Sequence, residues 1–334
     1  MALLTTFVIA YINLQNKYMD NGISVIICCY NSGWIIERCL GALSKQSFSK
    51  PIDWEIILVD NNCTDDTTDK AKKVMKGLNV DFSIVKETTP GLLSARIKGI
   101  NTAKYDISIY CDDDNILNSC YLERLYDTMN GDIYLGACGG VGIGEWGDRM
   151  ADYMSPQAFA VGCIVDNPKS LVGAGLCVRT KLVKDIYKNQ RFYLTGRCGD
   201  KALAGDDGEL VKSILLRGYK ICLNKQATFV HVIPANRLTY DYYERMLDGF
   251  YISSPIMRIY DKVLEGRKPH LYKAYLRTLF YFIKLRFKSN NVSDRLVHRK
   301  YAVQLMAYRF WGFSNLYRLY KDLTKIKQEW VQSL

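Results

Sequence analysis

Short apolar runs alternate with helical patterns over the first 115 residues of the chain. Four runs rich in β-branched residues predict buried strands at residues 23–28, 54–59, 82–86 and 107–110. Apolar positions at helical spacing between these runs predict helices at residues 34–43, 66–76 and 92–100. Strands that alternate with helices are typical of an α/β fold with a mainly parallel sheet.

The pattern continues less regularly after residue 120. It predicts helices at residues 121–129 and 210–216, and strands at residues 171–179, 220–223 and 227–232. Residues 136–147 are rich in glycine, which suggests close backbone approach or mobility. This fits a loop on the acceptor side of a site and equally a plain irregular connection. From residue 240 onward the pattern is helical, with breaks expected at Pro255 and Pro269.

These elements suggest three parts. An extension covers residues 1–20, an α/β domain covers residues 21–235 in two halves (21–115 and 116–235), and a helical region covers residues 236–334. The apolar stretch at residues 3–14 is too short to span a bilayer, which needs about 20 residues. We expect residues 1–18 to be an accessory helix or an over-long start, with Met19 as the true initiator.

The net charge of +11 lies in the last part of the chain. Residues 234–334 hold 19 Lys and Arg against 8 Asp and Glu, so the preceding residues are neutral overall. Four cations share one narrow helical face, at Lys273, Arg277, Lys284 and Lys288. A helix that shows its lysines to water would have this pattern too, but the aromatic and apolar bulk beside them favours an anionic membrane surface. No nucleic-acid-binding motif accompanies the charge.

The eleven cysteines have no repeated spacing and include no CxxC, which argues against a disulfide framework and favours a reducing cytosol. We therefore expect a cytoplasmic protein that binds peripherally to the cytoplasmic face of a membrane.

Candidate chemistry concentrates where the fourth strand ends, in the acidic run at residues 112–114. Polar side chains at the carboxyl end of a buried strand mark the place where open α/β sheets bind ligands. Three adjacent carboxylates repel one another, and Mg²⁺ or Mn²⁺ would relieve that repulsion, although a solvated acidic turn has the same composition. No GxGxxG follows the first strand and no GxxxxGK[ST] occurs, which argues against dinucleotide dehydrogenases and P-loop NTPases.

Several ordered motifs together resemble the family 2 glycosyltransferases of the GT-A fold. The resemblance covers about residues 22–240 and rests on residues 23–31, 55–67, 91–96 with Gly99, the acidic run 112–114, the segment 171–179 and the segment 206–210. Two positions depart from the family pattern: Ile97 replaces a common Asn, and Asp206 replaces a common Glu.

This resemblance implies the roles of individual residues. A nucleoside-diphosphate sugar, with a UDP-sugar as first choice, would bind across the strand ends. The donor-binding residues would be Tyr30, Asn31, Asp60, Arg96, Asp112, Asp113, Gly173 and Gly175. Asp60 would face the base, Arg96 the base or the phosphates, and Asp112 the ribose, while the two glycines would leave room for the sugar ring. Alternatively, Asp60 could simply cap the turn region 65–68, and Arg96 could be a charge on a helix surface.

The resemblance also implies the chemistry. Asp114, with His231, would ligate Mn²⁺ or Mg²⁺ at the diphosphate, and Asp207 would be the general base, whereas Asp206 could be an ordinary helix cap. His231 could equally be a packed strand residue, and Arg237 could reach a phosphate. The expected activity is metal-dependent transfer, with inversion, of a sugar to a glycan or lipid-linked acceptor in surface polysaccharide assembly. A nucleotidyltransferase and a non-catalytic membrane scaffold that binds nucleotide sugars are the alternatives.

Overall fold

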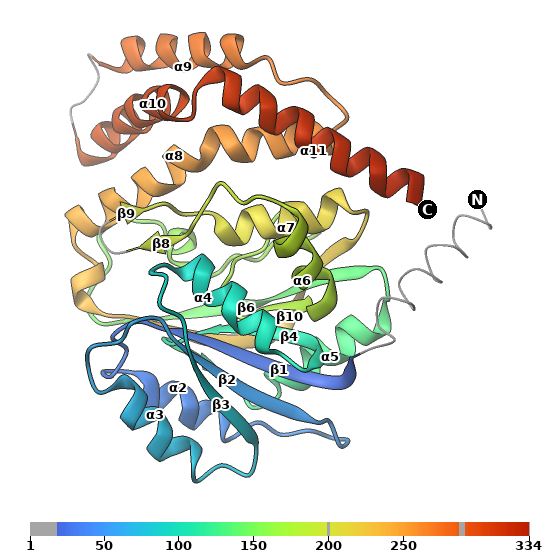
Figure 1. The fold of residues 1–334 in the computed structure, drawn as a ribbon. Helices are drawn as coiled ribbons and strands as arrows, with labels where there is room; N and C mark the ends of the chain where they lie inside the picture. The colour runs from blue at the N-terminus through green and yellow to red at the C-terminus, as the bar shows by residue number, and fades with distance from the viewer. Residues whose placement is uncertain (1–18, 199–200, 287–290, 334) are drawn as a thin grey trace.

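The computed structural model of the protein describes residues 19–198, 201–286 and 291–333. A central sheet carries helices on both faces, and a further layer of long helices lies beyond one of those faces (Figure 1). Within the described residues the sheet has eight strands in the order β3-β2-β1-β4-β7-β6-β10-β5. β7 and β5 run antiparallel to their neighbours, and the other pairs are parallel. The predicted α/β fold with a mainly parallel sheet is confirmed.

The first half of the domain forms the strands and helices that its periodicity predicts. The strands are β1 (Asp20–Cys29), β2 (Trp54–Asp60), β3 (Asp81–Lys86) and β4 (Tyr105–Asp112). The helices are α2 (Ile36–Leu43), α3 (Thr67–Met75) and α4 (Leu92–Thr102). Val25 and Ile27 of β1 pack in the core under α2 and α3, while Ile26 packs in the core under α4. Because both faces are covered, β1 is continuously apolar instead of alternating.

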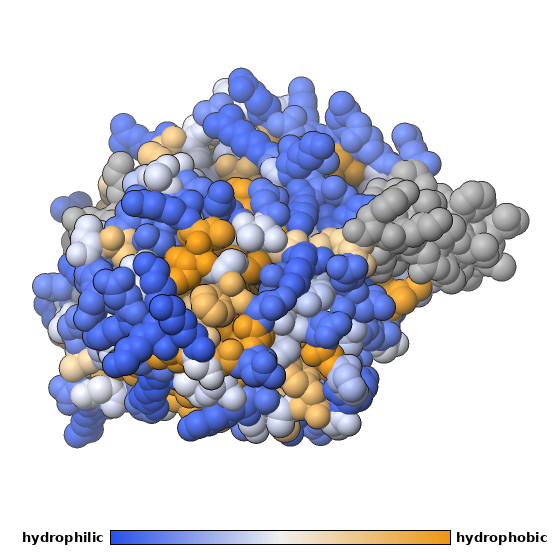
Figure 2. Space-filling model, turned by 60° about the horizontal axis from the view of Figure 1, so that its bottom comes forward, coloured by the Kyte–Doolittle hydropathy of each residue, from blue (hydrophilic) through white to orange (hydrophobic). Residues whose placement is uncertain are grey.

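In its described residues the second half adds two long strands, four short strands and further helices. Its strands are β5 (Asn115–Leu117), β6 (Leu135–Trp146), β7 (Leu176–Arg179), β8 (Arg197–Cys198), β9 (Lys201–Ala202) and β10 (Lys220–Ile233). Its helices are α5 (Tyr121–Gly131), α6 (Thr180–Asn189), α7 (Asp206–Leu216) and the 3₁₀ turns η1 (Pro156–Phe159) and η2 (Ala235–Arg237). Seen from the side of α2 and α3, the surface is hydrophilic with interrupted apolar patches (Figure 2).

The glycine-rich residues 136–147 are not a loop, so that prediction is wrong. They form β6, which pairs with β10 and β7 inside the sheet. Their glycines allow close packing: a Cβ at Gly140 would lie 2.4 Å from the Tyr121 hydroxyl, and one at Gly142 would lie 2.3 Å from the Ala160 carbonyl oxygen. The two predicted strands 220–223 and 227–232 are one strand, β10, with a register shift between Leu223 and Thr228.

The last hundred residues are helical, as predicted. They form α8 (Tyr240–Leu264), α9 (Leu271–Leu285), α10 (Val292–Trp311) and α11 (Phe313–Ser333). Pro269 lies between α8 and α9 as expected, but α8 continues through Pro255. Proline removes the bond to the Tyr251 carbonyl, and the Ser254 hydroxyl donates to that carbonyl at 2.8 Å instead. No described helix combines the length and apolarity needed to cross a bilayer. Lys288 and residues 1–18 lie outside the described residues.

A buried carboxylate joins α7 to the helical layer. Glu209 of α7 is fully buried and accepts bonds from the backbone N–H groups of Tyr193 and Leu194, at 3.0 and 2.8 Å. The hydroxyl of Tyr260, in α8, donates to the same carboxylate at 2.9 Å. Burial raises the pKa of Glu209 to about 7, although these donors act to lower it. Glu209 thus fixes α7 between a loop and α8.

We expect Glu209 to make stability depend on pH. Its folded-state pKa lies above the ordinary value of 4.5, so the folded protein holds the proton more tightly. Stability should therefore fall as pH rises from about 4.5 through 7, by on the order of 3 kcal/mol in total. Urea unfolding between pH 5 and 8 measures this, and Glu209→Gln, which resembles the protonated form, should remove that part of the slope. Equal slopes in both proteins would contradict the assignment.

Candidate active site at the carboxyl ends of the parallel strands

The predicted site residues gather at one edge of the sheet. β1, β2, β4, β6 and β10 are mutually parallel in direction, so their carboxyl ends meet there. Asp60 is the last residue of β2 and Asp112 the last of β4. The acidic run 112–114 therefore lies at this edge, where the loops after β1 and β2 also begin.

The loops after β1 and β2 hold one another. Asn31 has a positive φ of 53°, and its side-chain oxygen accepts the backbone N–H of Thr64 at 2.8 Å. An Asp60 oxygen accepts the backbone N–H of Cys63 at 2.8 Å, so Asp60 stabilises the turn directly after β2 and ahead of the region 65–68 that the alternative interpretation named. The Tyr30 ring beside them is 62% exposed. This part of the site is a preformed rim with an exposed aromatic ring.

A buried arginine joins three elements. Arg96 of α4 donates from Nη1 to Asp206 Oδ2 at 2.6 Å, and both side chains are less than 10% exposed. Its Nη2 lies 3.6 Å from Asp112 Oδ1 at the end of β4. Burial raises the pKa of Asp206, and the charge of Arg96 opposes that rise. The alternative that Arg96 is a surface charge is wrong, and Asp206 is an ion-pair partner at the first position of α7.

Asp207, the next residue, has different surroundings. Its Oδ2 accepts the backbone N–H of Gly173 at 2.7 Å, and the side chain is half-buried. A Cβ at Gly173 would lie 2.6 Å from Arg96 Nη2 and 3.0 Å from Asp207 Cβ. Close packing against Arg96 and Asp207 therefore accounts for glycine at 173, and the predicted room for a sugar ring stays a prediction.

Backbone conformation and packing against a different side chain require glycine at position 175. It has a positive φ of 69°, and a Cβ there would lie 2.2 Å from the Tyr121 hydroxyl, which donates to the Gly175 carbonyl at 2.7 Å. Close packing against a core tyrosine therefore accounts for Gly175, in place of the predicted room for a sugar ring.

Asp114 and His231 face each other across the edge of β10. His231 Nε2 lies 3.4 Å from Asp114 Oδ1, and His231 Nδ1 lies 2.7 Å from the carbonyl oxygen of Phe159. A carbonyl can only accept, so Nδ1 carries a proton. Nε2 faces Asp114; burial acts to lower the pKa of His231, but Asp114 outweighs it and raises it. Arg237 donates to the other Asp114 oxygen at 2.7 Å. Burial acts to raise the pKa of Asp114, but His231 and Arg237 outweigh it and lower it to about 2.

This pair fits a divalent cation. Asp114 Oδ1 is buried without a hydrogen-bond partner in the described structure, and the His231 Nε2 faces it at 3.4 Å. The described residues contain no group of three or more His, Cys, Asp or Glu side chains arranged for a metal. Two protein ligands still suffice where phosphate oxygens complete the shell, as is usual for Mg²⁺. A cation here would use Asp114, His231 and ligand oxygens.

Asp113, the middle aspartate of the acidic run, is hydrogen-bonded to the turn before α2. The Ser32 hydroxyl, in the turn before α2, donates to Asp113 Oδ2. Burial and the neighbouring charge of Asp114 raise the pKa of Asp113 to about 7. The sequence did not predict the bond from Ser32. The three adjacent carboxylates therefore point to three partners: Arg96, Ser32 and His231.

Sequence reasoning also missed a positioning residue. Asn61 is 6% exposed and donates to the carbonyls of Glu87 and Thr89 at 3.0 and 2.8 Å. Its oxygen accepts the backbone N–H of Gly91, which precedes α4, at 2.9 Å. Asn61 therefore sets where α4, and with it Arg96, begins. Its place directly after Asp60 was the available signal.

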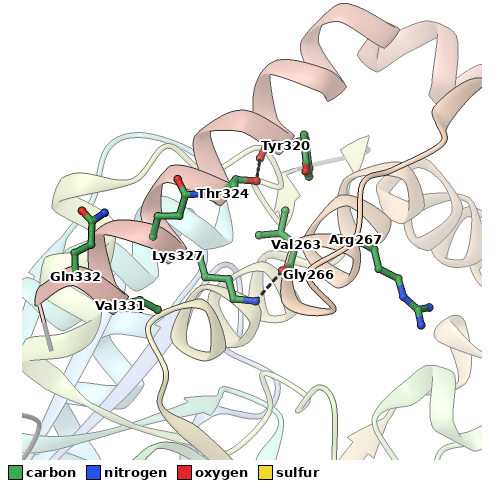
Figure 3. A pocket seen from close by; sticks show the side chains of 9 residues that line it. Val263, Gly266, Arg267, Tyr320, Thr324, Lys327, Val331 and Gln332 are labelled. Carbon is green, nitrogen blue, oxygen red and sulfur yellow. Dashed lines mark hydrogen bonds between the residues drawn. The ribbon is translucent and has the colours of Figure 1, made fainter. Parts of the chain in front are cut away.

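A pocket of about 520 Å³ lies elsewhere, between the end of α8 and α11 (Figure 3). Lys327 crosses it and donates to the Val263 and Leu264 carbonyls at the end of α8. None of the predicted site residues lines this pocket. The candidate site is thus defined by its polar side chains and not by this cavity.

Comparison with known proteins agrees with this geometry. Residues 24–170 match the family model described as glycosyl transferase family 2. A cholesterol galactosyltransferase of Borreliella burgdorferi is 32% identical over 121 residues, which are 36% of this chain and 32% of that protein. The chain matches only about a third of the length of the curated relatives.

Two solved structures share the fold over nearly the whole chain. TarS residues 1–349 of S. aureus, in complex with UDP-GlcNAc, has a TM-score of 0.53 and 16% identity, with 92% of each chain covered. The mannosyltransferase PcManGT of Pyrobaculum calidifontis has a TM-score of 0.54 and 15% identity, with 99% of this chain and 94% of that chain covered. In its matched segment and its strand-end motifs this chain is similar to the family 2 glycosyltransferases, and it shares the fold of these two enzymes.

Proposed function

We propose that the protein transfers a sugar from a nucleoside-diphosphate sugar to a hydroxyl group of a glycan or lipid-linked acceptor, with a divalent cation and with inversion. The observation that carries the proposal is the bridge from Asp206 through Arg96 to Asp112. It brings the start of α7, with its base candidate Asp207, to the strand end that carries the acidic run. A donor diphosphate and an acceptor hydroxyl need these two groups close together.

The donor would bind along the strand ends of the first half. Asp60, Asp112 and the Tyr30–Asn31 loop line that edge. The TarS structure holds UDP-GlcNAc, and the PcManGT structure holds GDP-Man and Mn²⁺. We propose a UDP-sugar as the donor to test first and a GDP-sugar as the second.

Asp114 and His231 would hold Mn²⁺ or Mg²⁺ together with the donor diphosphate. The cation, when bound, neutralises charge that develops on the leaving diphosphate. Arg237 contacts Asp114 and is 26% exposed, so it could turn towards the diphosphate and add a second positive charge. His231 keeps Nδ1–H on the Phe159 carbonyl, which fixes the ring with Nε2 towards the ligand.

Asp207 would take the proton of the acceptor hydroxyl. The hydroxyl oxygen then attacks the anomeric carbon while the bond to the diphosphate breaks. Attack opposite the diphosphate inverts the configuration and needs no covalent intermediate. The Gly173 N–H holds Asp207 in place, and the missing side chain of Gly173 lets Arg96 and Asp207 pack closely against its backbone.

Relatives support a glycan or lipid acceptor in general terms. Their names describe transfer to poly(ribitol-phosphate) and to cholesterol. We propose that this protein acts in surface polysaccharide or lipid-linked glycan assembly, peripherally at the cytoplasmic face of a membrane.

Replacing the base candidate should separate chemistry from binding. We expect Asp207→Asn to lower kcat at least about a hundredfold, because the amide cannot take a proton, with donor affinity nearly unchanged. Release of UDP or GDP, measured with a panel of nucleotide sugars, gives kcat, and calorimetry gives donor affinity.

The adjacent variant Asp206→Asn is the matched contrast. It leaves the buried Arg96 charge undercompensated, so it should lower thermal stability, which Asp207→Asn should not. If Asp207→Asn kept the full kcat, Asp207 would not be the general base. Release of pyrophosphate instead of UDP or GDP would favour a nucleotidyltransferase.

His231→Gln tests the metal assignment. We expect it to weaken Mn²⁺ binding in the presence of UDP or GDP at least about tenfold, because the amide replaces a ligand nitrogen. Isothermal titration with MnCl₂ measures this, with His298→Gln in α10 as the control histidine. Unchanged titrations for His231→Gln, or an equal loss in the control, would contradict the proposed ligand.

A further inference from the structure

α9 forms the outermost layer of the molecule, on the side away from the sheet (Figure 1). One face of α9 packs on α10. On that face Leu271 and Thr278 are buried, and Tyr281 and Phe282 stack on Tyr301 and His298. α9 therefore has a defined inner face, and the rest of its surface faces outward.

The outward surface of α9 carries a ridge of large apolar side chains. They are Tyr272, which is 67% exposed, Leu276 (43%), Phe280 (59%) and Ile283 (55%). At 3.6 residues per turn the four positions fall within an arc of about 80°. We name this set the apolar ridge. It is continuous along the helix, unlike single exposed apolar residues, which are ordinary.

Cations border the apolar ridge on one side. Lys273, Arg277 and Lys284 are exposed and fall in an adjoining arc of about 40°. The surrounding sequence, residues 266–293, contains seven Lys and Arg and no Asp or Glu. A surface that is apolar and purely cationic is complementary to an anionic lipid interface, where apolar groups enter the acyl boundary and cations contact headgroups.

We propose that α9 binds an anionic membrane surface, with the apolar ridge inserted and Lys273, Arg277 and Lys284 at the headgroups. This deepens the proposed function by naming the segment that would bring the enzyme to a lipid-linked acceptor. A second copy of the chain fits this face less well, because two acid-free helices would set like charges side by side. Nucleic acid would leave Leu276 and Ile283 without a partner.

Vesicle binding by the full-length protein tests the proposal. We expect co-sedimentation with phosphatidylglycerol-containing vesicles but little with phosphatidylcholine alone, and loss of binding at high salt as charges are screened. The double variant Phe280→Ser/Ile283→Ser should bind at least about tenfold less. Lys273→Gln/Arg277→Gln/Lys284→Gln should also bind less and should lose most of the salt dependence.

The matched control is Met306→Ser/Phe310→Ser, which removes two equally exposed apolar residues from α10 (66% and 68%). It should bind vesicles within about twofold of the parent. Failure of the parent to bind anionic vesicles, or equal losses in both double variants, overturns the proposal. So does a dimer, seen by light scattering without lipid, that Phe280→Ser/Ile283→Ser dissociates. Nucleotide release on soluble acceptors is independent of these results, so the proposed activity can fail or hold separately.

Discussion

The buried charge of Arg96 is the constraint on which the site depends. A guanidinium that is almost fully buried is stable only beside carboxylates, and breaking such a pair costs about 3–5 kcal/mol. Asp206 supplies the close partner, and Asp112 lies at a longer distance. This packing requires glycine at two positions. A Cβ at Gly173 would meet Arg96, and one at Gly196 would lie 2.9 Å from the Asp206 carboxyl. The ion pair therefore determines both the residues and the backbone around it.

The adjacent acids of α7 have separate tasks because they point in different directions. Asp206 faces inward and is neutralised by Arg96, so its charge serves the fold. Asp207 accepts the backbone N–H groups of Gly173 and Gly208, each at 2.7 Å, and remains half-buried, so part of its surface stays open. The acidic run divides in the same way, because successive residues after a strand project to different sides. Carboxylates that are equivalent in the sequence thus become unequal once each has its own partner.

The sequence predicted the alternation of strands and helices and the edge of the sheet where the site lies, because both follow from periodicity and strand direction. It did not predict contacts between distant segments. Nothing local distinguishes the glycines of β6, which accommodate Tyr121 and Ala160, from those of a mobile loop. Pro255 was expected to break α8, but the Ser254 hydroxyl replaces the lost bond. The bond from Ser32 to Asp113 likewise depends on tertiary structure.

The same dependence on tertiary structure connects the helical layer to the site. α7 begins with the acids of the site, and one turn later Glu209 contacts Tyr260 of α8. α8 in turn follows directly after Arg237, which bonds Asp114 on the other side of the site. α8 is thus linked to both sides of the site, once through the residues just before its start and once near its end. The C-terminal helices are therefore part of the frame that sets the distance between the Asp114–His231 pair and Asp207, and not an appendage to the α/β domain.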